Sequence, residues 1–70
     1  MAMKEIIFVV EETPEGGYTA NALGYSIYTE ADAWEGLKRM IRDAVKCHFT
    51  EEDRPQIIHI HAVKEERLAV

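Results

Sequence analysis

Cysteine is almost missing from this chain, because Cys47 is the only one in 70 residues. A lone thiol cannot form an intramolecular disulfide, so the chain is not one of the disulfide-rich domains typical of small secreted proteins. No apolar run approaches the roughly 18 residues of a membrane-spanning helix. The N-terminal apolar stretch is short and ends in acidic residues, unlike a secretory signal. We therefore expect a cytoplasmic protein that does not enter a membrane.

Basic residues are also few, with 8 Lys and Arg against 13 Asp and Glu and a formal net charge of −5. Proteins that bind nucleic acid normally carry a basic stripe that contacts the phosphates. We therefore expect no direct nucleic-acid binding. An acidic surface is better suited to a basic protein partner.

The chain lacks repeats, low-complexity tracts and linkers, so residues 1–70 are expected to form a single domain. A domain of this size is close to the lower limit at which one hydrophobic core keeps a chain folded. Disulfides are excluded, and small domains without them often gain stability from a partner. We expect a homo-oligomer, a dimer or larger.

Apolar residues occupy both faces of the first predicted strand, residues 4–12. Ile6, Phe8 and Val10 share one face, and Ile7 lies with Val9 on the other. A strand that is apolar on both faces is typical of the centre of a sheet that is covered on two sides.

A tight turn is predicted at residues 14–17, where proline and two glycines favour a chain reversal. We expect Gly17 to adopt a positive φ there, with Gly16 in the same turn. The next strand, residues 17–24, should pair antiparallel with the first. A third short strand is predicted at residues 25–29.

The clearest helix spans residues 32–49. Its apolar residues recur at helical spacing along one stripe, which contains Trp34, Leu37, Ile41, Ala44, Val45 and His48. Asp32 is the predicted N-cap with Glu35 in a capping-box position, and Thr29 with Asp32 is a second possible register. Trp34 is expected to anchor the core.

The chain after the helix predicts a fourth strand at residues 56–63 and a short fifth strand at residues 68–70. The resulting order is βββαβ(β). This pattern predicts an α+β fold, with one helix packed on an antiparallel-dominated sheet.

A short pattern joins the glycine turn to the start of the helix: Gly16, Gly17 and Tyr18 in the turn, then Asp32 and Glu35 at the helix. The pattern resembles the N-terminal domain of HicB-type antitoxins, in which a Gly-Gly-Tyr turn precedes a helix that opens with acidic residues. The resemblance covers roughly residues 4–49.

The chain departs from that family at three positions. Ala31 stands where the family has glycine, Ala33 where it has serine or threonine, and Gly36 where a second glutamate is common.

The resemblance implies a partial RNase H-like fold without nuclease activity. It also implies a protein that binds and neutralises a small basic ribonuclease toxin of the HicA type, with no catalysis and no cofactor. Such antitoxins usually carry a DNA-binding module as well, and we expect none here, because only seven residues follow Val63. The alternative is a stand-alone oligomeric module that binds a ligand or protein and has no catalytic role.

The residues that follow from this hypothesis lie mainly around the turn. The candidate partner-binding residues are Glu11, Glu12, Glu15 and Tyr18. The negative charge of the three glutamates would attract a basic partner and raise its association rate. Gly16 and Gly17 are assigned to the turn, and Asp32 and Glu35 to the helix cap.

Two other groups resemble functional sites. His59 and His61 share one face of a strand, which is a possible metal-ligand pair, with His48 as a third ligand. No cysteine or acid lies near them in the sequence, so we expect half-buried sheet residues and no metal. Cys47 lacks a recognisable catalytic base, so we expect a buried or half-buried structural thiol.

Overall fold

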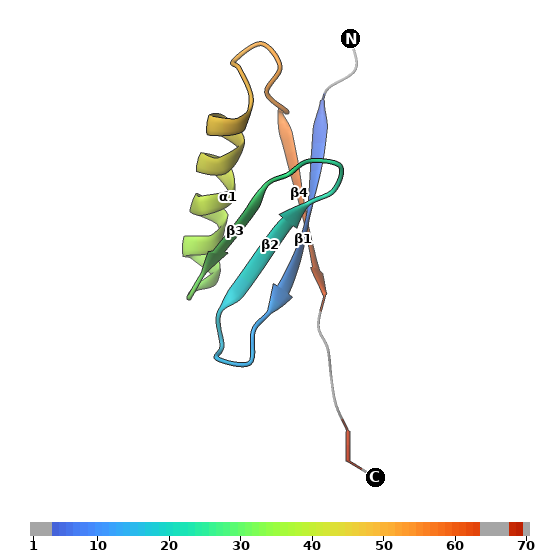
Figure 1. The fold of residues 1–70 in the computed structure, drawn as a ribbon, viewed down its shortest axis with the longest axis vertical. Helices are drawn as coiled ribbons and strands as arrows, with labels where there is room; N and C mark the ends of the chain where they lie inside the picture. Colours follow the sequence, from blue (N-terminus) through green and yellow to red (C-terminus); the bar gives the residue numbers. More distant parts are fainter. Residues whose placement is uncertain (1–3, 64–67, 70) are drawn as a thin grey trace.

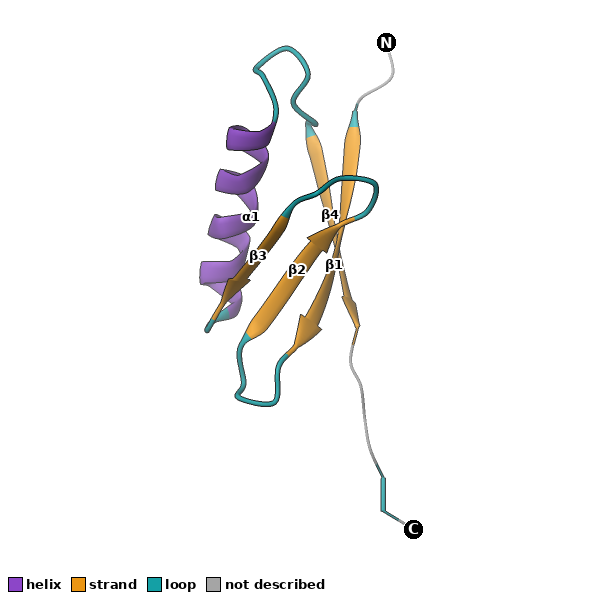
Figure 2. Ribbon diagram, viewed as in Figure 1, coloured by secondary structure: helices purple, strands orange, loops and turns teal. Residues whose placement is uncertain are grey.

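The computed structural model describes residues 4–63 and 68–69, in which one helix packs on a four-stranded sheet (Figures 1 and 2). The order of elements is βββαβ, which confirms the predicted α+β class. The elements are β1 (Glu5–Glu12), β2 (Tyr18–Ala22), β3 (Tyr28–Ala31), α1 (Trp34–His48) and β4 (Ile57–Val63).

The sheet is mixed, with the strand order β3-β2-β1-β4. β1 pairs antiparallel with β2, and β2 pairs antiparallel with β3, as expected of strands joined by short turns. β4 lies on the other side of β1 and pairs parallel with it. A parallel neighbour requires a crossover connection, and α1 provides it between β3 at one edge and β4 at the other.

The core lies between α1 and one face of the sheet. Its fully buried large side chains come from alternate positions of β1 and from one stripe of the helix: Ile6, Phe8, Val10, Leu37, Ile41 and Val45. Complete burial of each such side chain contributes about 1.5–3 kcal/mol. Burial therefore confirms both predicted periods: buried side chains recur every two residues in β1 and every three to four residues in α1.

The second apolar face of β1 is not covered by any described residue. Ile7 is 41% exposed and Val9 is only partly buried. The prediction that β1 is central is confirmed, and among the described residues only one of its two faces is covered, so cover on the second face stays a prediction. The chain has one long helix among the described residues, and that helix occupies the opposite face.

The third strand begins three residues later than predicted. Residues 23–27 form a turn that is closed by a 3.0 Å hydrogen bond from the Ala22 N–H to the Ile27 carbonyl oxygen, with Gly24 at φ +81°. A left-handed residue at this point reverses the chain and delays the strand. Ile27 is nevertheless buried in the core.

The predicted fifth strand at residues 68–70 is not found at residues 68–69, the two of this range that the structure describes. Leu68 and Ala69 have no strand structure, and Leu68 is 87% exposed. Val70 lies outside the described residues.

The helix begins two residues later than predicted, and its N-cap is Ala33 instead of Asp32. Ala33 has the extended backbone of a cap residue, with φ −130° and ψ 150°, but its side chain has no hydrogen-bonding group. Thr29, the alternative cap, is buried within β3. The predicted capping box is wrong as well, because Glu35 is only two residues after the Ala33 cap; Glu35 lies in the first turn and pairs with Lys38 at 3.1 Å.

Replacing Ala33 by serine should stabilise the protein, because a hydroxyl at this position can accept a hydrogen bond from a free N–H of the first turn. We expect Ala33→Ser to raise the free energy of unfolding by about 1 kcal/mol. Asp32→Ala is the comparison, since Asp32 makes no cap hydrogen bond, and it should change stability by less than about 0.5 kcal/mol. Urea denaturation of both variants measures the difference. A larger loss in Asp32→Ala than gain in Ala33→Ser would mean that Asp32 caps the helix.

The residue with positive φ in the β1–β2 turn is Gly16, at +90°, and the prediction for Gly17 is wrong. Gly17 is constrained by space instead. A Cβ there would lie 3.1 Å from the Ala31 carbonyl oxygen and 3.3 Å from the Thr13 Oγ1. Both glycines are needed for the turn, but for different physical reasons.

Alanine at Gly16 should destabilise the protein by about 1 kcal/mol or more, because the Cβ of an L-residue makes a left-handed backbone conformation sterically unfavourable. Gly17→Ala should also destabilise it, since β3 backbone must shift to admit the methyl group. Gly36→Ala is the control: it lies within α1 with its nearest contact at 3.8 Å, and it should stabilise the protein by about 0.5–1 kcal/mol. Thermal melts rank the three variants. A Gly16→Ala protein as stable as the parent would contradict the left-handed assignment.

Candidate functional site

The tip of the β1–β2 hairpin is held in one conformation by Thr13. Its carbonyl oxygen accepts a 3.0 Å hydrogen bond from the Gly16 N–H, and its Oγ1 accepts one of 2.9 Å from the Gly17 N–H. The Thr13 N–H in turn donates to the Gly17 carbonyl oxygen at 2.8 Å. The backbone of this loop is therefore held in one conformation by three hydrogen bonds.

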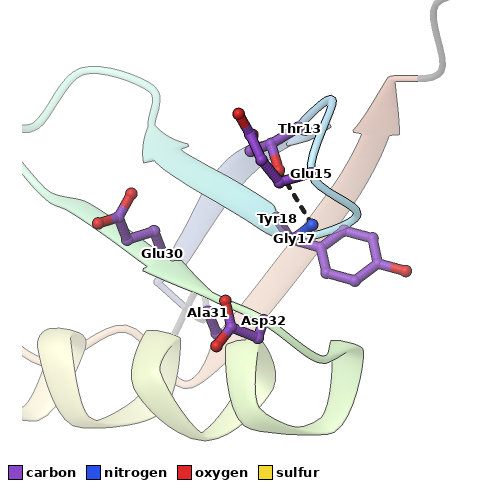
Figure 3. A pocket seen from close by; sticks show the side chains of 7 residues that line it. All are labelled: Thr13, Glu15, Gly17, Tyr18, Glu30, Ala31 and Asp32. Carbon is purple, nitrogen blue, oxygen red and sulfur yellow. Dashed lines mark hydrogen bonds between the residues drawn. The ribbon is translucent and has the colours of Figure 1, made fainter.

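A shallow pocket lies beside this tip, between the turn and the end of β3 (Figure 3). The pairing of Tyr18 with Ala31 brings the end of β3 next to the hairpin. Three acids from three parts of the chain surround the pocket: Glu15 in the turn, Glu30 in β3, and Asp32 before α1. Its remaining lining residues are Thr13, Gly17, Tyr18 and Ala31. We call this set the acidic pocket.

The described ion pairs leave the acidic pocket without a cation of its own. Lys4 pairs with Asp53 at 3.3 Å near the opposite end of β1, where its hydrogen bond, together with that of Thr50, lowers the pKa of Asp53. Lys38 pairs with Glu35 on the helix. Among the described residues, no ion pair reaches Glu15, Glu30 or Asp32.

Glu30 has a polar neighbour on its own strand. It accepts a 3.3 Å hydrogen bond from the Tyr28 hydroxyl. The pKa of Tyr28 is raised, first by desolvation of the hydroxyl and then by the charge and hydrogen bond of Glu30. A phenol is protonated at neutral pH, so the Tyr28 hydroxyl serves as a donor to the carboxylate.

Tyr18 connects the pocket to the helix. Its ring packs edge-to-face on Trp34, with centroids 5.4 Å apart and an interplanar angle of 72°. Trp34 is only partly buried and packs against the core cluster, so it contributes less to the core than predicted. Aromatic pairs of this geometry contribute about 0.5–1.5 kcal/mol beyond the area they bury. The contact fixes the hairpin relative to the first turn of α1.

The structure separates the predicted partner-binding residues. Glu15 and Tyr18 line the acidic pocket, whereas Glu11 and Glu12 do not. Side chains alternate along a strand, so Glu11 and Glu12 project to opposite faces of β1, and both are exposed. The register that pairs Glu11 with Thr19 and Thr19 with Glu30 places Glu11 in the same cross-strand row as Glu30.

Sequence reasoning missed Glu30 as a member of the site and assigned Asp32 only to the cap. The available signal was the hairpin itself. Once residues 18–22 are paired with the following strand, residues 30–32 must lie beside the turn. The third strand was predicted to begin three residues too early, so the proximity of residues 30–32 to the turn was not predicted.

The strand histidines are exposed, so the prediction of half-buried side chains is wrong. The Nε2 of His59 lies 3.2 Å from the Oε1 of Glu5 on the neighbouring strand. The two residues are 54 positions apart in the sequence, so the sequence alone did not show this contact. His48 packs instead against the Phe49 ring, with centroids 4.9 Å apart. Within residues 4–63 and 68–69, no three His, Cys, Asp or Glu side chains gather as a metal site.

The lone thiol is exposed, so the prediction of a buried or half-buried Cys47 is also wrong. Cys47 lies two positions after the buried Val45, which is about 200° around the helix axis. Its side chain therefore points away from the apolar stripe and into solvent.

The described part of the chain contains no helix long and apolar enough to cross a membrane. No family model matches the sequence, and no solved structure matches it. The partial RNase H-like fold that the HicB resemblance implies therefore stays a prediction.

Two relatives match over most of their length. A UPF0150 protein of Thermotoga maritima is 48% identical over 67 residues, which cover 96% of this chain and 94% of the relative. A UPF0150 protein of Archaeoglobus fulgidus is 58% identical over 52 residues, or 74% of this chain and 77% of the relative. At this identity and coverage, the chain belongs to the UPF0150 family.

Proposed function

We propose that this protein is an antitoxin of the HicB type, which binds a small basic ribonuclease toxin of the HicA type and neutralises it. The observation that carries the proposal is the acidic pocket, which Glu15, Glu30 and Asp32 line with no cation paired to them in the described structure. The resemblance of the Gly-Gly-Tyr turn to HicB-type antitoxins supports the same function.

The acidic pocket has the chemistry to receive a basic side chain. Carboxylates accept charge-assisted hydrogen bonds from guanidinium and ammonium groups, and these are about twice as strong as neutral ones. Tyr18 lines the same pocket and offers an aromatic ring on which an arginine can stack. We infer that a Lys or Arg of the toxin occupies the pocket.

Rigidity of the hairpin favours such binding. The turn is held by the Thr13 hydrogen bonds and by the contact of Tyr18 with Trp34, so little conformational freedom remains to be lost on association. The exposed carboxylates Glu11 and Glu12 at the end of β1 add to the negative field near the hairpin turn. A field of this kind raises the association rate of a basic protein and makes the rate depend on salt.

The first test is inhibition. The purified protein should bind a HicA-type toxin in stoichiometric amounts and stop its cleavage of RNA in solution. Calorimetry measures the stoichiometry, and a fluorescent RNA substrate measures the residual nuclease activity. If no basic toxin binds at any salt concentration, the antitoxin proposal fails and the protein is a stand-alone module.

Charge reversal locates the interface. In Glu15→Lys/Glu30→Lys, association with the toxin should slow about tenfold at low salt, because two attractive charges become repulsive. The difference should shrink as ionic strength rises, since salt screens the interaction. Association rates from stopped flow across a salt series give both results.

Glu51→Lys/Glu52→Lys is the matched control. It changes the net charge by the same amount in the exposed loop between α1 and β4, at the opposite end of the sheet from the β1–β2 turn (Figure 1). Circular dichroism confirms that both variants are folded. Equal slowing in the two variants would show that net charge alone acts and that the acidic pocket is not the binding site.

A further inference from the structure

β4 has an unpaired side. In the part of the chain that the structure describes, β4 is at the end of the strand order and has β1 as its one neighbour. It is seven residues long, which leaves a row of backbone N–H and C=O groups free along its outer side. Such an edge is a template for a further strand.

The edge also lacks the features that normally prevent association. Ile57–Val63 contains no Asp, Glu, Lys, Arg or Pro, in a chain of which 30% is charged. The opposite edge, β3, is only four residues long and carries Glu30. Charges and short edges protect sheets against unwanted pairing, so β3 is protected and β4 is not.

The direction of the free groups follows from one hydrogen bond. The Ile57 N–H donates to the Lys4 carbonyl oxygen at 3.3 Å, so Ile57 bonds inward toward β1. Backbone groups alternate in direction along a strand. The N–H and C=O groups of Ile58, Ile60 and Ala62 therefore point outward, away from the sheet.

The helix layer is incomplete above this edge. α1 lies over β3 and β2, and Ile58 and Ile60 on the same face of β4 are only partly buried. A depression of about 120 Å³ separates them from Lys38, Ile41 and Arg42 of the helix. A neighbouring strand at the edge would remove more of these isoleucines from water.

We propose that β4 is a homodimer interface, in which a second copy adds its own β4 antiparallel and joins the two sheets into one. A strand without charge offers nothing to attract an acidic or a basic partner, but it is complementary to itself. Antiparallel pairing of identical strands has the two-fold symmetry that most homodimers adopt. The inference does not depend on the proposed function.

Symmetry determines the register. The antiparallel register that pairs all of Ile57–Val63 is centred on Ile60, which faces the partner's Ile60. Ile58 then lies opposite the partner's Ala62, and Ile57 opposite the partner's Val63. Because all three outward-pointing residues meet outward-pointing residues, the pairing forms about six backbone hydrogen bonds.

The first measurement is the mass in solution. Light scattering on the full chain at micromolar concentration should give twice the chain mass of 8.0 kDa. A monomer under these conditions would overturn the proposal.

Cysteine cross-linking tests the register. In a Cys47→Ser background, Ile60→Cys should form an intermolecular disulfide on mild oxidation, because directly opposed residues have Cα atoms about 4.5–5.5 Å apart. Ile57→Cys alone should not cross-link, since the two copies of residue 57 are about 20 Å apart in this register. A mixture of Ile57→Cys and Val63→Cys should form the mixed disulfide.

The mixed pair also guards against a folding defect in Ile60→Cys, because Ile57 and Val63 lie at the ends of β4 outside the buried core. Non-reducing gels and intact mass measure each product. A dimer in which Ile57→Cys cross-links with itself, or in which neither Ile60→Cys nor the mixture cross-links, would show that the copies associate through another surface, such as the open face of the sheet.

Discussion

The packing of alternate β1 side chains against the apolar stripe of α1 is the interaction on which the rest of this small structure depends. Phe8 of β1 is fully buried and belongs to the same core cluster as Leu37 and Ile41 of α1. β1 is also hydrogen-bonded on both sides, to β2 and to β4. Removing this layer would leave four strands without a covered hydrophobic face, and a small sheet needs such a face or packing against a helix to be stable.

One helix cannot cover a four-stranded sheet. α1 crosses from β3 to β4 but packs over β3 and β2, so within the described residues it covers neither the outer part of β4 nor the opposite face of the sheet. The exposed Ile7 and the partly buried Ile58 and Ile60 are direct consequences. A domain with so small a core leaves apolar surface that a longer chain would cover with a second layer. The proposed pairing of β4 follows from this shortage.

Much of the fold could be predicted from the sequence where periodicity is strong. The alternation around Phe8 and the stripe through Leu37 and Val45 each identify an element and its buried face, because burial and side-chain period are directly coupled. The parallel pairing of β4 with β1 is a different matter, since it depends on contacts more than 45 residues apart in sequence. Local patterns contain no information on such neighbours.

The predictions for the third strand and the helix cap were wrong because backbone conformation overrides the sequence pattern at these positions. Residues 25–27 have the composition of a strand, but the left-handed Gly24 places them in a turn. Asp32 is a better cap residue than Ala33, yet the hydrogen bonds of α1 begin with the Leu37 N–H and the Ala33 carbonyl oxygen. Tertiary packing of the helix stripe decides that start, and the side-chain preference at one position is too weak to oppose it. The acidic pocket was missed for the same reason, because it depends on where β3 begins.

The two proposed surfaces lie at opposite edges of the sheet, and this separation has an electrostatic consequence. The acidic pocket involves the turn and β3, whereas β4 is the other edge in the order β3-β2-β1-β4. Each copy has a net charge of −5, so association through the acidic surface would be opposed by repulsion. Association through the uncharged β4 keeps the acidic pockets far apart, at the two outer ends of the joined sheet. A dimer built in this way leaves both pockets free, so each could receive a basic partner without disturbing the contact between the two copies.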